Sequence, residues 1–338
     1  MSSAALLLGY GLSLALAAPA LARAGWPERA PRLGIWAWQA LTASMLLSVV
    51  LAGLVVTVST APVSGGLGDL LQACGLMIRA HYEAPGGPAV AAAGSVLALA
   101  VAGRTGWCLT GSLLGARRER RAHARVLALV GTADPVLGVT VVEDARPAVY
   151  CLPGLGHRIV LTSAALAALE PKALTAVIAH ERAHIRGRHH LVLAYAGALE
   201  RAFPFPAIFR AAAVQTRRLV EMAADDEATA CADGPLPLAG ALLELAGPAD
   251  RGGGSAASLA AGGDVAPRIR RLLGPRRPLR RAVTWIGAMA AGGVLVLPFV
   301  LAAHPAVAAT SVNACPLPYS QVPSPSTPCG LTAASATW

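Results

Sequence analysis

Apolar stretches long enough to cross a membrane alternate with more polar, basic stretches along this chain. Three of them, 4–22, 35–58 and 282–303, hold about 20 consecutive residues without a charge, which is the length that a spanning helix needs. A fourth, 89–115, is interrupted once, by Arg104. The pattern predicts four transmembrane helices. We expect Arg104 to extend its guanidinium to the membrane edge rather than to serve in signalling.

The first apolar stretch has two interpretations. Ala20, Leu21 and Ala22 resemble a signal-peptidase site at the end of an apolar core, which suggests a cleaved signal peptide. However, no positive charge precedes the stretch, and three Arg follow it before residue 35. Positive charge after a span favours a retained helix whose N-terminus lies outside the cell. We therefore expect a retained helix, with the signal peptide as the alternative.

Basic residues are concentrated in alternate loops, which predicts the orientation. Segment 116–281 holds 23 Lys and Arg, whereas 59–88 holds one and 304–338 holds none. Basic loops face the cytosol. Five Trp lie near the expected cytosolic ends of the spans, as interfacial aromatic residues do: Trp26, Trp36, Trp38, Trp107 and Trp285.

These patterns predict a multi-pass protein of the plasma membrane with its N-terminus outside. Residues 1–115 are expected to form a three-span membrane region and 116–281 a cytosolic domain. The fourth transmembrane helix would occupy 282–303, and 304–338 would form a short, disordered tail outside the cell.

Composition agrees with a membrane protein and limits the meaning of the net charge of +10. Hydrophobic residues make up 55% of the chain and charged residues only 14%, against about 25% in soluble domains. The Arg clusters at 117–121 and 276–281 flank predicted spans, so we expect them to contact anionic lipid. No helix-turn-helix or aromatic–basic pattern accompanies them, and direct binding of nucleic acid is not expected.

Cysteine usage follows the same topology. Cys151 and Cys231 fall in the expected cytosolic segment and should stay reduced. Cys74, Cys315 and Cys329 fall outside, where disulfides persist, and Cys315 with Cys329 is the pair that we favour, although spacing does not fix the connectivity. No CxxC pair occurs, so a thiolate zinc site is not indicated.

The pattern of segment 116–281 predicts a mainly helical α+β domain with a small sheet. Strands are expected at 138–142, 148–152 and 159–162, the last two forming a hairpin around Pro153 and Gly154. Helices are expected from Pro171 to Gly187 and over 217–232. The apolar run 191–213 is interrupted by Glu200, Arg201, Pro204 and Pro206. We expect it to lie on or dip into the membrane rather than cross it.

The first of these helices carries His180-Glu181-Arg182-Ala183-His184, the pattern HExxH. His180 and His184 lie four residues apart on one helix face, so both imidazoles can reach one metal ion. Glu181 lies about 100° around the helix, where it can act as a general base without binding the ion. Charged groups are costly on a largely apolar, buried helix unless they are paired or bind a metal. The motif therefore predicts a catalytic metal site.

A third ligand is expected from the helix over 217–232. Glu221 can complete a site of two His and one Glu, and Asp225, on the same face, can accept the spare N–H of a ligating histidine. Asp226 and Glu227 compete for these roles, but we expect them to face solvent. His189 and His190 lie off the ligand face and are expected at the surface or the membrane interface.

The HERAH segment, followed 37 residues later by the Glu of EMAAD, resembles the gluzincin membrane peptidases. The nearest resemblance is to the BlaR/MecR antirepressor class, over roughly 89–303, including the hairpin at 149–154 and the stretch 268–273. This resemblance implies a zincin-like protease domain between spans, Zn²⁺ as cofactor, and a cytosolic transcriptional repressor as protein substrate. Tyr150 and His157 are weak candidates for substrate binding or oxyanion stabilisation, and the strand at Tyr150 is expected to pair with an extended substrate.

Two departures keep other functions open. BlaR-type receptors carry a penicillin-binding domain after the last span, and the 35 residues at 304–338 are too short for one. The HtpX type of membrane protease shares the motif but usually has two spans between HExxH and the third ligand, where this chain has only the interrupted run 191–213. The alternatives are therefore an HtpX-like quality-control protease or a non-catalytic receptor that binds a repressor. The intact Glu181 argues against the receptor.

Overall fold

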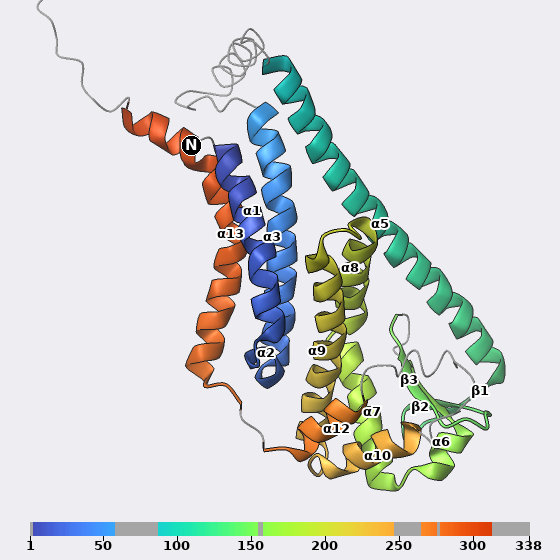
Figure 1. Ribbon diagram of the computed structural model, residues 1–338. Coiled ribbons are helices and arrows are strands. Elements are labelled where there is room, and N and C mark those ends of the chain that lie inside the picture. The colour runs from blue at the N-terminus through green and yellow to red at the C-terminus, as the bar shows by residue number, and fades with distance from the viewer. Residues whose placement is uncertain (1–2, 58–86, 155–157, 247–264, 276–277, 313–338) are drawn as a thin grey trace, which may run out of the picture.

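The computed structural model describes residues 3–57, 87–154, 158–246, 265–275 and 278–312. Four of its helices are long and apolar enough to span a membrane, which agrees with the four expected spans. They are α1 (Ser3–Arg23), α3 (Pro31–Thr57), α5 (Gly87–Val130) and α13 (Arg281–Val312). Figure 1 shows α1, α3 and α13 side by side, while α5 diverges from α3 toward the sheet at the far end of the molecule.

Two helices run past their expected ends. α5 continues as one helix to Val130, so the predicted domain boundary at residue 116 falls inside it. Neither Gly nor Pro occurs between Ala116 and Val130, and the Ala, Arg and Leu of this stretch favour helix. α13 continues past Ala303 to Val312, which includes the first residues of the expected tail. Cys74, Cys315 and Cys329 lie outside the described residues.

A proline creates the polar contact that joins α1, α3 and α13. Pro298 has no N–H, so the carbonyl of Val294, one turn earlier, lacks its helical partner. The Tyr10 hydroxyl of α1 donates to this oxygen at 2.9 Å, and Ser44 Oγ of α3 donates to it at 2.6 Å. An unsatisfied carbonyl is costly in a bilayer, so the two hydroxyls stabilise this three-helix contact.

α3 and α5 approach closely through glycine. A Cβ on Gly53 would lie 2.4 Å from the carbonyl oxygen of Gly94. One turn further on, Thr57 and Ser95 form a hydroxyl–hydroxyl hydrogen bond at 2.9 Å. Small residues and interhelical hydroxyl bonds are typical of helix contacts in membranes.

The interrupted run at 191–213 forms the turn of a helical hairpin together with most of its first helix and the start of its second. α8 (His189–Ala202) packs along α5, and α9 (Ala207–Cys231) packs along α3 (Figure 1). Neither helix is among the candidate spans. Arg104 Nε of α5 donates to the carbonyl of Ala202 at 2.5 Å, at the end of α8. The last carbonyls of α8 lack helical donors, so Arg104 supplies one of them with a hydrogen-bond partner.

A four-stranded sheet follows α5. The order is β1-β2-β4-β3, with β2 and β4 parallel and the other pairs antiparallel. β2 (Val139–Val142), β3 (Val149–Leu152) and β4 (Arg158–Thr162) confirm the three expected strands, and β3 and β4 form the expected hairpin. β1 (Gly131–Asp134) was not predicted, because its sequence GTAD lacks apolar alternation and becomes a strand only by pairing with β2.

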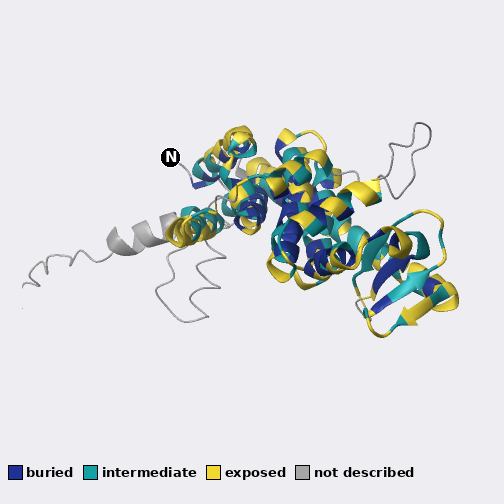
Figure 2. Cartoon of the chain, turned by 90° about the horizontal axis from the view of Figure 1, so that it is seen from below, coloured by how far each residue is buried: buried dark blue, intermediate teal, exposed yellow. Residues whose placement is uncertain are grey.

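The remaining helices enclose a core next to the sheet. α7 (Pro171–Arg186) packs against β3, β4 and α9, and α10 (Leu236–Ala246) covers another side of α7. α2, α6 and α12 are short helices at Trp26–Arg29, Ser163–Ala168 and Val265–Leu273. Figure 2 shows buried residues gathered in the central helices and exposed residues on the outer faces of the long ones. The buried face of α7 carries His180 into this core.

Candidate metal centre

The candidate metal centre is built on α7. Pro171 begins this helix and Gly187 caps it, as the sequence predicts. His180 is 7% exposed and His184 is partly buried, one turn further along. The two Nε2 atoms lie 3.0 Å apart, so both imidazoles point to the same place.

Glu221 reaches the same place from α9. One carboxylate oxygen lies 3.5 Å from Nε2 of His180, and the other lies 3.6 Å from Nε2 of His184. Tetrahedral Zn²⁺ at about 2.0–2.1 Å from each ligand atom requires ligand atoms about 3.4 Å apart. The three observed separations lie around that value, so this donor set fits a zinc ion with one position left for water or substrate.

Asp225 and Arg268 form a second layer behind the three donors. Nδ1 of His180 lies 3.1 Å from Oδ1 of Asp225, an arrangement that directs Nε2 toward the candidate ion. Arg268, from α12, donates to Asp225 through Nε at 2.9 Å and Nη2 at 2.6 Å, and its Nη1 lies 3.1 Å from Glu221. Sequence patterns did not assign Arg268 this place. The only sequence feature that distinguishes Arg268 is its place in the Arg- and Leu-rich stretch 268–273.

His189 is also part of this layer, contrary to the surface position expected for it. It is 7% exposed, and its Nδ1 lies 3.1 Å from Nδ1 of His184. The chain reverses at Arg188, whose φ of 48° is left-handed, and this turn folds the start of α8 back onto α7. A Cβ on Gly187 would lie 2.3 Å from the His189 ring, so glycine permits the close approach. Helical spacing cannot predict a contact made across such a turn.

Glu181 lies beside the edge strand β3. Its carboxylate interacts with the thiol and the backbone of Cys151, and burial raises its pKa. A raised pKa brings a carboxylate closer to the neutral range in which a general base works best. The same burial, together with Glu181, raises the pKa of the Cys151 thiol, so this cysteine stays protonated at neutral pH.

The electrostatic environment shifts the pKa values of His180 and His184 in opposite directions. Burial and the neighbouring His180 lower the pKa of His184 to about 4, which keeps it neutral as a ligand must be. For His180, burial opposes the charged form, but Asp225 and Glu221 outweigh it and raise the pKa to about 9. The pKa values of both carboxyls are lowered to about 2, against the effect of burial, by hydrogen bonds from His180. A metal ion would displace the proton on Nε2 of His180 and leave the one that faces Asp225.

Two weak candidates from the sequence are not placed in this centre. The Tyr150 hydroxyl lies 2.9 Å from Nε2 of His123 on α5. Successive strand residues point to opposite faces, so Cys151 faces Glu181 while Tyr150 faces away. His157 lies outside the described residues.

Asp226 and Glu227 are ion-paired; the Asp226 side chain remains 40% exposed, whereas that of Glu227 is 19% exposed. Asp226 lies 2.7 Å from Arg271, and Glu227 lies 2.7 Å from Arg186 and also pairs with Arg32. These ion pairs tie α9 to α12, α7 and α3. The sequence correctly directs both carboxylates away from the metal side chains, but it does not reveal their partners.

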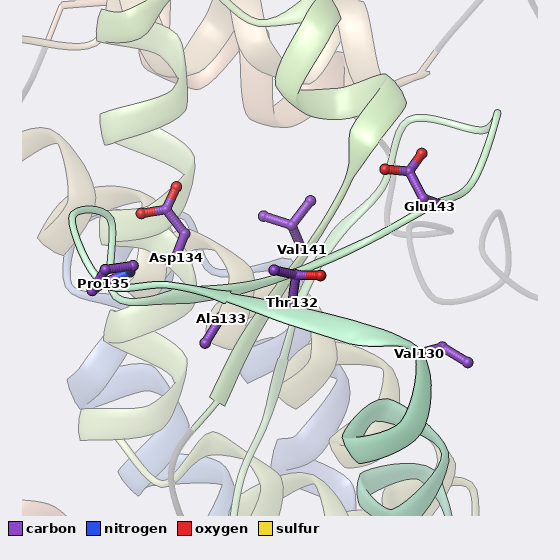
Figure 3. Close-up of a pocket in the computed structure, with 7 residues that line it drawn as sticks. All are labelled: Val130, Thr132, Ala133, Asp134, Pro135, Val141 and Glu143. Atoms are coloured by element: carbon purple, nitrogen blue, oxygen red, sulfur yellow. The ribbon is translucent and has the colours of Figure 1, made fainter.

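A separate hollow lies on the sheet. It has a volume of about 520 Å³. Figure 3 shows residues that line it along β1 and β2, among them Thr132, Asp134 and Glu143. None of the described residues that line it belongs to the metal centre. The hollow is therefore distinct from the candidate active site.

Comparison with known proteins agrees with this site. No curated protein and no solved structure matches the chain. Residues 116–224 match the family model described as Peptidase family M48, and this stretch contains His180, Glu181, His184 and Glu221. Peptidases of that family are metalloproteases, typically zinc-dependent. The match and the His-His-Glu cluster together support a metallopeptidase domain in this part of the chain.

Proposed function

We propose that this protein is a membrane-embedded zinc endopeptidase that hydrolyses peptide bonds on the cytosolic side of the plasma membrane. The observation that carries the proposal is the convergence of His180, His184 and Glu221 beside Glu181, in a segment that matches a metallopeptidase family. Four apolar helices support the membrane location. The basic segment 116–281 supports the orientation.

The side chains of the site have separable roles in such a reaction. A bound Zn²⁺ would polarise the scissile carbonyl and lower the pKa of water. Glu181 would take a proton from the attacking water and deliver it to the leaving amine. Asp225 and His189 would hold the ring orientations of His180 and His184. The free edge of β3 would bind the substrate backbone by strand addition.

Two physiological roles fit this chemistry. The resemblance to the BlaR/MecR class suggests cleavage of a transcriptional repressor. The match to Peptidase family M48 instead favours HtpX-like quality control of membrane proteins, so we place that role first. A repressor whose level falls only when Glu181 is intact would reverse this order.

The direct test of the proposed function is proteolysis by detergent-purified protein. Glu181→Gln keeps size and removes the base, so cleavage of an unfolded protein substrate should fall by at least about 100-fold while zinc is retained. Glu244→Gln, an exposed carboxylate on α10, is the matched control and should leave cleavage unchanged. Equal cleavage by wild type and Glu181→Gln would refute the catalytic assignment and favour a non-catalytic receptor.

A further inference from the structure

A large basic cleft lies next to the candidate active site. It has a volume of about 1110 Å³ and is lined by residues of α5, the end of β3 and the start of α8. Among the described residues that line it, none is acidic and six are arginine: Arg117, Arg120, Arg121, Arg125, Arg158 and Arg188. None of these six pairs with a carboxylate of the described part of the chain. The cleft therefore carries a concentrated positive charge that no carboxylate among the described residues neutralises.

The cleft begins within one helical turn of the proposed general base. Ile185, which lines it, follows Glu181 by four residues and lies on the same face of α7. Leu152, which also lines it, directly follows Cys151, the strand residue that contacts Glu181. Gly154 lies three residues beyond Cys151, about 10 Å along the chain. An extended substrate paired with β3 would thus enter the cleft within a few residues of the cleaved bond.

We propose that this cleft binds an acidic stretch of the polypeptide substrate, on one side of the scissile bond. The inference rests on the proposed peptidase function and adds to it a charge preference. Arginine pairs well with carboxylates. A cleft lined by six arginines would therefore recognise the Asp and Glu side chains of an extended polypeptide. Six guanidiniums that have no carboxylate partner among the described residues would also disfavour a basic stretch at this place.

The position of the cleft favours a polypeptide over a lipid headgroup. Arg125 lies ten residues beyond Gly115, where the apolar part of α5 ends, or about 15 Å along the helix. The headgroup layer on one side of a bilayer is only about 5–8 Å thick. The cleft therefore extends past the depth of headgroups and toward Glu181.

Fluorogenic peptides that share one cleavage sequence test the proposal. Three Glu, three Gln or three Lys would be placed on either side of the scissile bond. Purified full-length protein should cleave the Glu peptide at least about 10-fold faster than the Gln peptide, in kcat/KM and for one side only. The Arg120→Glu/Arg158→Glu variant should lose this ratio and cleave the Lys peptide faster than wild type does. A misfolded variant would not gain activity on any peptide.

Arg118→Glu is the matched control, because Arg118 is exposed on the same helix but does not line the cleft. This variant should keep the wild-type ratio. Equal cleavage of Glu and Gln peptides by active wild type would overturn the proposal and leave the peptidase function intact, whereas cleavage of no peptide would count against the peptidase function itself. The preference would also be overturned if the double variant changed only activation by phosphatidylglycerol nanodiscs, which would assign the cleft to lipid.

Discussion

Arg268 offers the sharpest test of how the candidate metal centre is held together. It is 8% exposed and makes two hydrogen bonds to Asp225, which is fully buried. Its third contact is to Glu221, a candidate ligand. Arg268→Met keeps the approximate volume of the side chain and removes the charge, so it isolates the electrostatic contribution.

The expected cost follows from the charges that remain. Breaking a buried ion pair typically costs about 3–5 kcal/mol, because one charge is left uncompensated. Asp225 keeps its contact with His180, so we expect the lower end of this range. The free energy of unfolding should fall by about 3 kcal/mol, and the melting temperature by about 6–12 °C. The orientation of His180 and Glu221 would loosen as well, and zinc affinity should fall by about 10–100-fold.

The assay is thermal unfolding of the detergent-purified, metal-free protein, followed by zinc titration against a competing chelator. Arg270→Met is the matched control, because Arg270 is exposed on the same short helix. The double variant Arg268→Met/Asp225→Asn should be less destabilised than the sum of the single variants, since the unpaired charge is gone. Equal melting temperatures and zinc affinities for Arg268→Met and Arg270→Met would refute the reasoning.

Three further predictions test other parts of the account. His189→Ala should weaken zinc binding by about 10-fold, because His184 loses the partner that faces its second ring nitrogen; unchanged affinity would mean that the contact does not orient the ligand. Tyr10→Phe combined with Ser44→Ala should lower the unfolding free energy by about 1–3 kcal/mol without affecting zinc content, since the Val294 carbonyl is left unsatisfied; an unchanged melting temperature would argue against that interhelical contact. A reporter active only in the cytosol should fluoresce when inserted after Asp233, whereas a reporter active only outside should work when fused after Trp338; the reverse pattern would overturn the orientation.

Local patterns predict the elements that carry the chemistry. HExxH spacing, a proline at the start and a glycine at the end are sufficient to define α7 and the face of His180 and His184. Equal spacing identifies Glu221 and Asp225 as one face of α9. The four long apolar helices follow from hydropathy alone.

What sequence patterns miss depends on contacts between distant segments. Arg268 is 43 residues from Asp225, and no periodicity links the two. His189 approaches His184 only because Arg188 adopts a left-handed conformation. This conformation is uncommon for arginine, so the sequence does not predict it. Nor does the sequence reveal that Arg104 donates to the carbonyl of Ala202 at the end of α8, 98 residues away. Local helical spacing predicts the residues of the motif. The residues that orient them come from distant segments that only tertiary packing brings together.

The central claim is that His180, His184 and Glu221 form one zinc site. The most direct measurement is the metal content of detergent-purified protein by inductively coupled plasma mass spectrometry, with wild type beside His184→Ala and Glu221→Ala. The account predicts about one zinc per chain in wild type and a loss of that zinc in both variants. A folded wild type without zinc, or a Glu221→Ala variant that keeps it, would contradict the assignment.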